Sequence, residues 1–389
     1  MRCFKCASVI CALFVASQAF SMGKKEHLFP EGQVFPLIML AVGESDFAQV
    51  REGEFNAVHR YQRELNQKEL SKYYASARKY NLQVVQQLPA EQLPNSEAWW
   101  QEKITWLASH DNLAWWYLPE EKRALEVKKL ADLIHSIDPL KRPTATYLAW
   151  QKEPLLSEFK GVLDILIKSS YPAFYAEPHA TVLAWLTNIS DVRDSIPISI
   201  GCSELFHLKG NSPTAKGLRF DEYASLVMGV KGMAWYSWAR GKDVDPSLEK
   251  EARQFAWEMN GPDNHTRLGP VVIEGEEINR ITGKVLSGPQ ESPSTKFFDV
   301  KKNTTVLRTW PSLLWKEKRF GPQTYVFSVN SAEVYPPRAS YTSAEILAEF
   351  TIPNPTKSVE VLFEGRKIPV KEGKFVDKFD PLGVHIYRY

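Results

Sequence analysis

The chain has 389 residues, enough to build more than one sizeable core. Its 48 basic and 46 acidic side chains almost balance, which argues against nucleic acid or an anionic membrane surface as the main partner. The 12 Trp, 15 Tyr and 20 Phe residues exceed what a core alone needs. Exposed aromatic rings in a cleft commonly stack on the faces of sugars, although large cores absorb many such rings too.

Residues 1–21 have the pattern of a secretory signal peptide. Arg2 and Lys5 precede an apolar run over residues 7–16, and small residues at 17–21 offer cleavage sites. The run is too short to span a membrane. A lipoprotein anchor is disfavoured because Cys11 lies inside the apolar run, without small residues of the required kind before it. We therefore expect an exported protein, secreted or periplasmic, without membrane insertion.

The positions of the four cysteines indicate a fold stabilised by its apolar core and not by disulfides. Three of the four cysteines fall within residues 1–21, and only Cys202 lies beyond them. The exported chain would then lack an internal disulfide, so its stability must come from apolar packing. We identify no histidine that could orient Cys202 as a nucleophile, and a buried thiol is the simpler expectation.

Apolar runs that read as strands alternate with mostly helical segments up to residue 260. The expected strands are 35–43, 55–61, 82–88, 112–118, 142–149, 161–169, 196–202 and 232–239. The expected helices are 65–80, 96–110, 122–137, 179–187, 220–228 and 246–260. This alternation predicts a (β/α)₈ TIM barrel. A doubly wound sheet is disfavoured, because residues 43–46 lack the glycine-rich phosphate turn that should follow its first strand.

The pattern changes after the barrel. Residues 283–295 are rich in Gly, Ser and Pro and read as a linker. Short strands are expected beyond it at 305–309, 324–329, 346–352, 359–363, 367–370 and 384–389. No helix competes with them, so a small all-β sandwich is predicted. The expected domains are a barrel over 22–285 and a sandwich over 295–389.

The ends of the barrel strands should meet at one rim, where α/β barrels place their chemistry. The rim candidates are His59, Arg60, Tyr61, Gln86, Gln87, Glu120, Glu121, Tyr147, Trp150, Tyr171, Cys202, Glu204, Trp235, Tyr236 and Trp238. Carboxylates from the fourth and seventh strands would face each other across the mouth. One could protonate a leaving oxygen while the other attacks or activates water. Such an inventory suits a neutral, polyhydroxylated substrate.

Structural roles are open for several of these residues. Glu120 and Glu121 follow Pro119 and could simply be first-turn residues of a helix, favoured beside its positive N-terminus. Glu204 could cap a helix, and Tyr171 and Trp235 could belong to the core. Successive strand residues face opposite ways, so only one of Glu120 and Glu121 should point into the mouth.

The order of strands and rim residues resembles the (β/α)₈ glycoside hydrolases of clan A, which often carry an appended β-sandwich. In that clan a Glu at the end of strand 4 is the acid/base, and a Glu at the end of strand 7 is the nucleophile. Residues 115–121 are similar to the first motif, with Glu121 on the acid/base and Glu120 on the usual asparagine. Residues 198–204 are similar to the second, which makes Glu204 the nucleophile.

Three further segments carry the resemblance. Tyr171 resembles the strand 6 tyrosine that contacts the nucleophile, and residues 235–238 resemble the aromatic strand 8 that floors the sugar site. The stretch 375–387 looks like the last strands of the appended sandwich. The chain also departs from the clan pattern, because Glu120 replaces the asparagine and no proline follows Glu121. Either glutamate can therefore be the acid.

The resemblance implies an exported glycoside hydrolase that acts on a poly- or oligosaccharide by a two-carboxylate, retaining mechanism. The expected catalytic residues are Glu121, Glu204 and Glu120, and the expected substrate contacts are His59, Tyr61, Gln87, Trp150, Tyr171, Trp235 and Trp238. The sequence has no P-loop, no H-E-x-x-H and no paired His-x-His, so neither a cofactor nor a metal is expected. The alternatives are a non-catalytic carbohydrate-binding protein on a degenerate barrel and, less favoured, a lyase or carbohydrate esterase.

Overall fold

The computed structural model describes residues 34–148, 154–169, 171–192, 196, 198–206, 213–238, 245–262, 267–299, 302, 304–334, 342–353 and 356–389. The predicted signal peptide lies outside these residues and stays a prediction. Within the described ranges no helix combines the length and the apolar character needed to cross a membrane.

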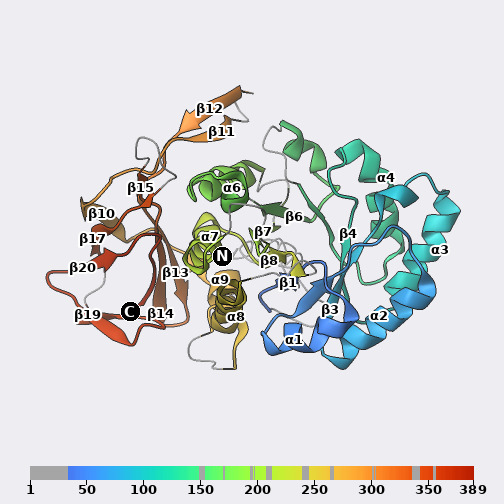
Figure 1. Cartoon of the computed structure of the whole chain (residues 1–389), viewed down its shortest axis with the longest axis horizontal. Helices are drawn as coiled ribbons and strands as arrows, with labels where there is room; N and C mark the ends of the chain where they lie inside the picture. The colour runs from blue at the N-terminus through green and yellow to red at the C-terminus, as the bar shows by residue number, and fades with distance from the viewer. Residues whose placement is uncertain are drawn as a thin grey trace, which may run out of the picture.

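Eight parallel strands close into a barrel in chain order, which confirms the predicted TIM barrel (Figure 1). The strands are β1 (Leu37–Met39), β2 (Ala57–His59), β3 (Gln83–Gln87), β4 (Leu113–Tyr117), β5 (Thr144–Tyr147), β6 (Ile165–Ser169), β7 (Ile198–Glu204) and β8 (Met233–Tyr236). The barrel closes because β1 pairs with both β2 and β8. All strand ends therefore meet at one mouth.

Helices surround the barrel and connect its strands. They are α1 (Phe47–Glu52), α2 (Gln67–Lys79), α3 (Glu97–Ala108), α4 (Ala124–Ile137), α5 (Pro172–Tyr175), α6 (Thr181–Val192), α7 (Ala215–Met228), α8 (Pro246–Asn260) and α9 (Gly269–Glu274), with short 3₁₀ turns at Glu44–Asp46, Ala90–Gln92 and Pro154–Phe159. Three of the longer helices, α2, α3 and α7, begin at a capping side chain. Asn66, Ser96 and Thr214 each accept a hydrogen bond from a backbone N–H of the first turn of α2, α3 or α7.

Strand alternation divides the aromatic run of β4 between two cores. Trp115 and Tyr117 belong to the cluster inside the barrel. Trp116 belongs to the layer between the barrel and the helices, where its indole N–H donates to Asp138 at 2.8 Å. Tyr117 thereby delivers its phenol to the floor of the mouth.

The C-terminal region is an all-β sandwich, as predicted. A six-stranded sheet has the order β19-β18-β21-β14-β13-β9, and a three-stranded sheet has the order β10-β17-β20. Both sheets contribute to one apolar cluster, in which the Phe350 ring lies 5.5 Å from the Tyr387 ring. The strands are β9 (Glu276–Glu277), β10 (Thr282–Ser287), β11 (Thr295–Asp299), β12 (Thr304–Arg308), β13 (Leu313–Phe320), β14 (Gln323–Asn330), β15 (Glu333–Val334), β16 (Thr342–Ser343), β17 (Ile346–Thr351), β18 (Ser358–Val361), β19 (Arg366–Pro369), β20 (Lys374–Phe379) and β21 (Val384–Arg388).

The boundary between the domains lies earlier than the sequence suggested. β9 pairs with β13, and β10 pairs with β17, so both already belong to the sandwich. The barrel therefore ends near residue 275, not 285, and part of the expected linker 283–295 is strand. β10 was read as linker because its Gly and Ser interrupt the apolar alternation that indicates a strand. β13 escaped prediction because residues 316–319 are all charged.

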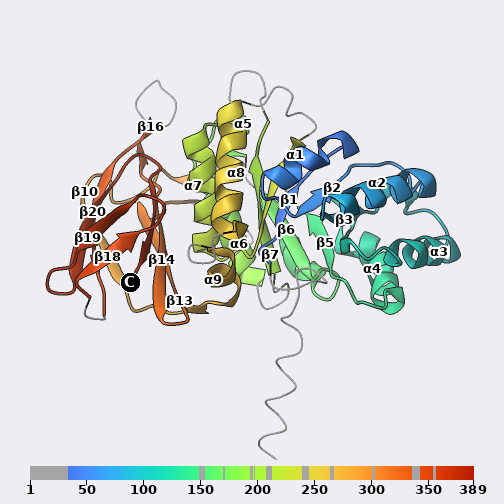
Figure 2. The same cartoon turned by 90° about the horizontal axis from the view of Figure 1, so that it is seen from below.

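The sandwich packs on one side of the barrel. The outer face of its six-stranded sheet supplies Tyr325, Phe327, Val329 and Ile386 to the same apolar cluster as the barrel helices. Both views place α7 and α8 between the sandwich and the barrel strands, while α2, α3 and α4 lie on the far side (Figures 1 and 2). The β6–β8 half of the barrel is therefore backed by a second domain, and the β2–β5 half is not.

Candidate active site

A cavity of about 260 Å³ opens at the carboxyl ends of the barrel strands. Its wall combines one carboxylate with four phenol rings that come from different strand ends. The residues are Leu40, Tyr61, Glu120, Tyr147, Tyr171 and Tyr236. The predicted rim is thus a real hollow in the described part of the chain, and it is dominated by tyrosine.

Glu120 is the carboxylate of this cavity. Its Oε1 accepts a hydrogen bond from the Tyr61 hydroxyl at 2.7 Å and a second from the Tyr117 hydroxyl. Burial raises the pKa of Glu120, and the two phenol donors oppose that rise. A carboxyl that holds its proton to a higher pH than usual can act as a general acid.

Glu121 takes a different position. It adopts a left-handed backbone conformation, with φ of 55°, and it is not among the residues that line the cavity. The strand alternation that was expected to decide between the two glutamates ends at Tyr117, because β4 ends there. The turn through Pro119, not the strand, brings Glu120 to the mouth.

His59 lies beneath the cavity and does not line it. The side chain is fully buried, and its ring packs against the rings of Tyr61 at 4.5 Å and Tyr117 at 4.7 Å. Within the described residues neither ring nitrogen has a hydrogen-bond partner. Burial lowers the pKa of His59 to about 3, so the imidazole is neutral and supports the two phenols by packing.

Gln87 holds the segment that carries Tyr61. Its side-chain oxygen accepts from the Gln62 backbone N–H at 2.7 Å, and the Gln62 side-chain amide donates to the Gln87 carbonyl at 2.9 Å. This pair of bonds ties the loop after β2 to the end of β3. Gln87 therefore positions the cavity wall in the structure.

Tyr171 and Tyr236 form the opposite wall. Their rings stack with centroids 6.3 Å apart, and the Tyr171 hydroxyl lies 3.8 Å from Cys202 Sγ. Cys202 is buried, as expected, and burial raises the pKa of its thiol to about 12. A thiol with so high a pKa is a poor nucleophile at neutral pH.

Glu204 ends β7 but is enclosed. Its side chain is almost fully buried, and its two oxygens accept from the backbone N–H groups of Ala173 at 2.9 Å and Phe174 at 3.3 Å. Burial raises the pKa of Glu204 to about 7, and the nearby charge of Asp221 adds to the rise. Glu204 is not among the residues that line the described cavity, so the two predicted carboxylates occupy different environments.

Two of the expected tryptophan contacts, Trp235 and Trp238, do not line the described cavity. Trp235 is fully buried on the helix-facing side of β8, where its indole N–H donates to Glu222 at 2.9 Å; the expectation that it floors a sugar site is wrong for this reason. Trp238 is half-buried against the same layer. Trp150 lies outside the described residues. Tyr147 and Tyr236, which appeared only as rim candidates, line the cavity instead; both end their strands, and that was the available signal.

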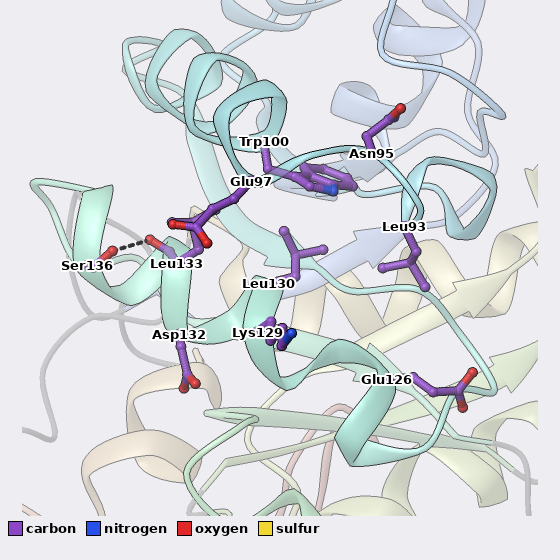
Figure 3. A pocket seen from close by; sticks show the side chains of 10 residues that line it. All are labelled: Leu93, Asn95, Glu97, Trp100, Glu126, Lys129, Leu130, Asp132, Leu133 and Ser136. Carbon is purple, nitrogen blue, oxygen red and sulfur yellow. Dashed lines mark hydrogen bonds between the residues drawn. The ribbon is translucent and has the colours of Figure 1, made fainter.

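A larger hollow of about 640 Å³ lies elsewhere, between α3 and α4 on the outside of the barrel (Figure 3). Leu93, Trp100, Leu130 and Leu133 line it together with charged side chains such as Glu126 and Lys129. It shares no lining residue with the cavity at the mouth. Among the described residues no cluster of His, Cys, Asp and Glu has the makings of a metal site.

Sequence comparison finds no relative: no protein-family profile and no curated protein matches the chain. Solved structures do match. The α-amylase of Geobacillus thermoleovorans, complexed with acarbose, has a TM-score of 0.58 at 10% identity, over 92% of this chain and 98% of the amylase. AmyP in complex with maltose has a TM-score of 0.56 at 8% identity, over 93% of this chain and 97% of AmyP.

A GH42 β-galactosidase from G. stearothermophilus also matches, with a TM-score of 0.56 at 8% identity, over 94% of this chain and all of that one. The likeness spans nearly the whole of each protein, so it includes the C-terminal β region as well as the barrel. Identities this low carry information on fold alone. The chain thus shares its fold with these proteins.

Proposed function

We propose that the protein is a glycoside hydrolase that cleaves glycosidic bonds of a poly- or oligosaccharide. One observation carries the proposal: Glu120, with a raised pKa, sits in a cavity walled by four tyrosines at the carboxyl ends of the barrel strands. The phenol rings and hydroxyls suit stacking on, and hydrogen bonding to, a neutral sugar. The shared architecture with an α-amylase and a β-galactosidase agrees with this reading.

In this proposal Glu120, not Glu121, is the general acid. Burial raises the pKa of the Glu120 carboxyl, which favours the protonated form that a general acid needs. This carboxyl gives the proton to the glycosidic oxygen as the bond to the anomeric carbon breaks. The hydroxyls of Tyr61 and Tyr117 then stabilise the carboxylate that forms, since both already donate to Oε1.

We assign Glu204 the role of nucleophile in a retaining mechanism. Its support is its place at the end of β7 and the two backbone N–H groups that can stabilise its ionised form. A retaining pair has its carboxyl groups roughly 5–5.5 Å apart, and an inverting pair roughly 6.5–9.5 Å. Proton NMR of the first product formed tests the assignment: a retained anomeric configuration, with azide rescue of Glu204→Ala, supports it. An inverted first product would exclude it.

A carbohydrate-binding protein is the second candidate, favoured by one specific observation. Glu204 is 1% exposed, so the described cavity presents a single carboxylate. A site with one carboxylate can bind a sugar without cleaving it. This alternative predicts saturable sugar binding with no turnover.

The experiment is a screen of aryl glycosides and polysaccharides for release of reducing sugar, with calorimetric binding to the same panel. The glycosidase predicts turnover by the wild type that is largely lost in Glu120→Gln. Binding without turnover would establish the alternative. We also propose that the protein acts after export, and N-terminal sequencing of the mature protein should then begin near residue 22.

A further inference from the structure

A second group of ionisable side chains, buried or half-buried, joins the two domains. His179, in the turn before α6, has its Nδ1 2.9 Å from an oxygen of Asp221 on α7. Glu333 comes from β15 of the sandwich, and its Oε2 accepts from the Ala180 backbone N–H at 3.2 Å. The Glu333 side chain is 4% exposed. The sandwich therefore places a buried carboxylate on a turn of the barrel.

That turn is a short distance along the chain from the cavity wall. Tyr171 lines the cavity and precedes α5 directly, and the first N–H groups of α5 bind Glu204. The chain then reaches Ala180, which Glu333 holds. Residues 171–180 are thus fixed at one end by Glu204 and at the other by Glu333. A displacement of the chain at the Glu333 contact should therefore displace the N–H groups that bind Glu204.

Charge couples the same groups. His179 lies near Asp221, Glu333 and Glu204, and these three carboxylates together raise its pKa to about 9 against the effect of burial. The resulting imidazolium in turn lowers the pKa of Glu204, while burial of that carboxyl raises it. The protonated ring therefore favours the ionised form of Glu204.

α7 leaves a specific space for this imidazole. A Cβ on Gly217 would lie 2.5 Å from His179 Cε1 and 2.7 Å from Nε2. Gly217 occupies the first turn of α7 with ordinary helical backbone, so the absence of a side chain serves the neighbouring ring and not the helix. The position of His179 is thus set from the barrel side as well as from the sandwich.

We propose that Glu333 is a positioning residue through which the sandwich domain sets the geometry of Glu204 and Tyr171 at the barrel mouth. Its effect on hydrolysis rests on the proposed glycosidase activity, whereas its hold on His179 does not. Loss of the Glu333 carboxylate releases the turn at Ala180, so the α5 N–H groups shift away from Glu204. The carboxyl of Glu204 then loses donors that lower its pKa.

The test compares Glu333→Gln with Glu345→Gln. Glu345 belongs to the same domain, but its side chain is 63% exposed and pairs with Lys378 of the sandwich at 2.8 Å. The first readout is the pH titration of the His179 ring protons by NMR, which needs no enzymatic activity. Glu333→Gln should lower the pKa of His179, and Glu345→Gln should leave it unchanged.

The second readout is kinetic. A displaced catalytic group costs up to about 100-fold in rate, so kcat of Glu333→Gln should fall by about 10-fold to 100-fold, with a smaller change in KM. The rise in activity with pH that reports ionisation of Glu204 should move to higher pH. Gly217→Ala should reproduce both effects from the barrel side, and Glu333→Asp should restore part of the activity.

Wild-type titration of His179 together with a wild-type pH profile in Glu333→Gln would overturn the inference. Should Glu333→Gln fail to fold, Glu333→Asp decides by the same readouts: an unchanged His179 titration and profile overturn it, and a shift supports it. If the wild type turns over no glycan, the proposed function fails, but the titration still decides whether Glu333 positions His179.

Discussion

The two halves of the barrel present their carboxylates in opposite ways. At the end of β4, Glu120 lies in an open cavity and takes hydrogen bonds from the side chains of Tyr61 and Tyr117. At the end of β7, Glu204 lies under α5 and takes hydrogen bonds from backbone N–H groups. The sandwich backs the second half and leaves the first half free of it (Figure 1).

This difference determines how each carboxyl can be tuned. Burial raises the pKa of both, but different groups oppose it. Phenol donors can be removed one at a time by mutation, so the environment of Glu120 is set locally. The N–H donors of Glu204 move only with the segment that bears them, so its environment depends on the packing of the second domain.

The largest expected effect comes from removing the sandwich. A chain that ends at residue 275 would expose the apolar surface that now packs on Tyr325, Phe327 and Val329. We expect an insoluble or strongly destabilised product, measured by solubility and thermal unfolding. A soluble truncated barrel with full activity would show that the β7 half of the barrel does not need the sandwich domain packed against it.

Next in size is the effect of Glu120→Gln. A general acid contributes about 10²–10⁴-fold to turnover, and this substitution removes the proton while keeping the shape. Glu121→Gln is the matched control, because Glu120 lines the cavity and Glu121 does not. The Glu121→Gln change should alter kcat only a few-fold. Equal, mild losses in both variants would remove the end of β4 from the mechanism.

The barrel was predictable because the alternation of apolar runs and helical segments extends over many residues, so an error at any one residue does not change it. Eight apolar runs separated by helical segments indicate a closed barrel, whichever residue ends each run. The domain boundary was not predictable, because β9 has two residues and β10 carries Gly and Ser. Such strands are defined by their pairing partners, which lie far along the chain.

The site was predictable as a rim but not in its details. Strand-end tyrosines could be named from sequence: Tyr61 and Tyr171 as substrate contacts, and Tyr147 and Tyr236 as rim candidates. The choice of Glu121 over Glu120 relied on motif position, whereas the turn after Pro119 decides which side chain reaches the cavity. The enclosure of Glu204 depends on contacts with α5 and the buried charge of Asp221, and no local pattern encodes those contacts.

A smaller effect is expected from Tyr61→Phe, which removes one of the two donors to Glu120. The phenol bond lowers the pKa of Glu120, so its loss should raise that pKa. Because the acid works in its protonated form, the fall of activity with rising pH should move to higher pH. A shift of one unit corresponds to about 1.4 kcal/mol, to be read from the pH dependence of kcat/KM.

Tyr73→Phe provides the control for this comparison. The Tyr73 hydroxyl is buried and donates to the Val42 carbonyl instead of to Glu120, so the fall of activity at alkaline pH should stay in place. If Tyr61→Phe also left this fall unmoved, the phenol would not be tuning the acid. The pKa of Glu120 at the end of β4 would then be set mainly by burial, as that of Glu204 is at the end of β7.

The remaining effect is on stability and not on turnover: His59, beneath the β4 half, should make unfolding depend on pH. Its pKa is about 3 when folded and about 6.5 when unfolded. Below pH 6.5 the unfolded chain therefore binds one more proton than the folded chain, and stability falls as pH falls, by about 1.4 kcal/mol per unit at the steepest. Denaturant unfolding should show a shallower slope in His59→Phe; an identical slope would contradict the neutral, buried imidazole.

The most direct test of the central claim, that Glu120 is the general acid of a glycosidase, varies the leaving group. Wild type and Glu120→Gln should be compared on a dinitrophenyl glycoside, which departs without protonation, and on an unactivated oligosaccharide of the same sugar. We predict a loss on the order of 10²–10⁴-fold on the oligosaccharide and little loss on the dinitrophenyl glycoside. Equal losses on both substrates would contradict the assignment.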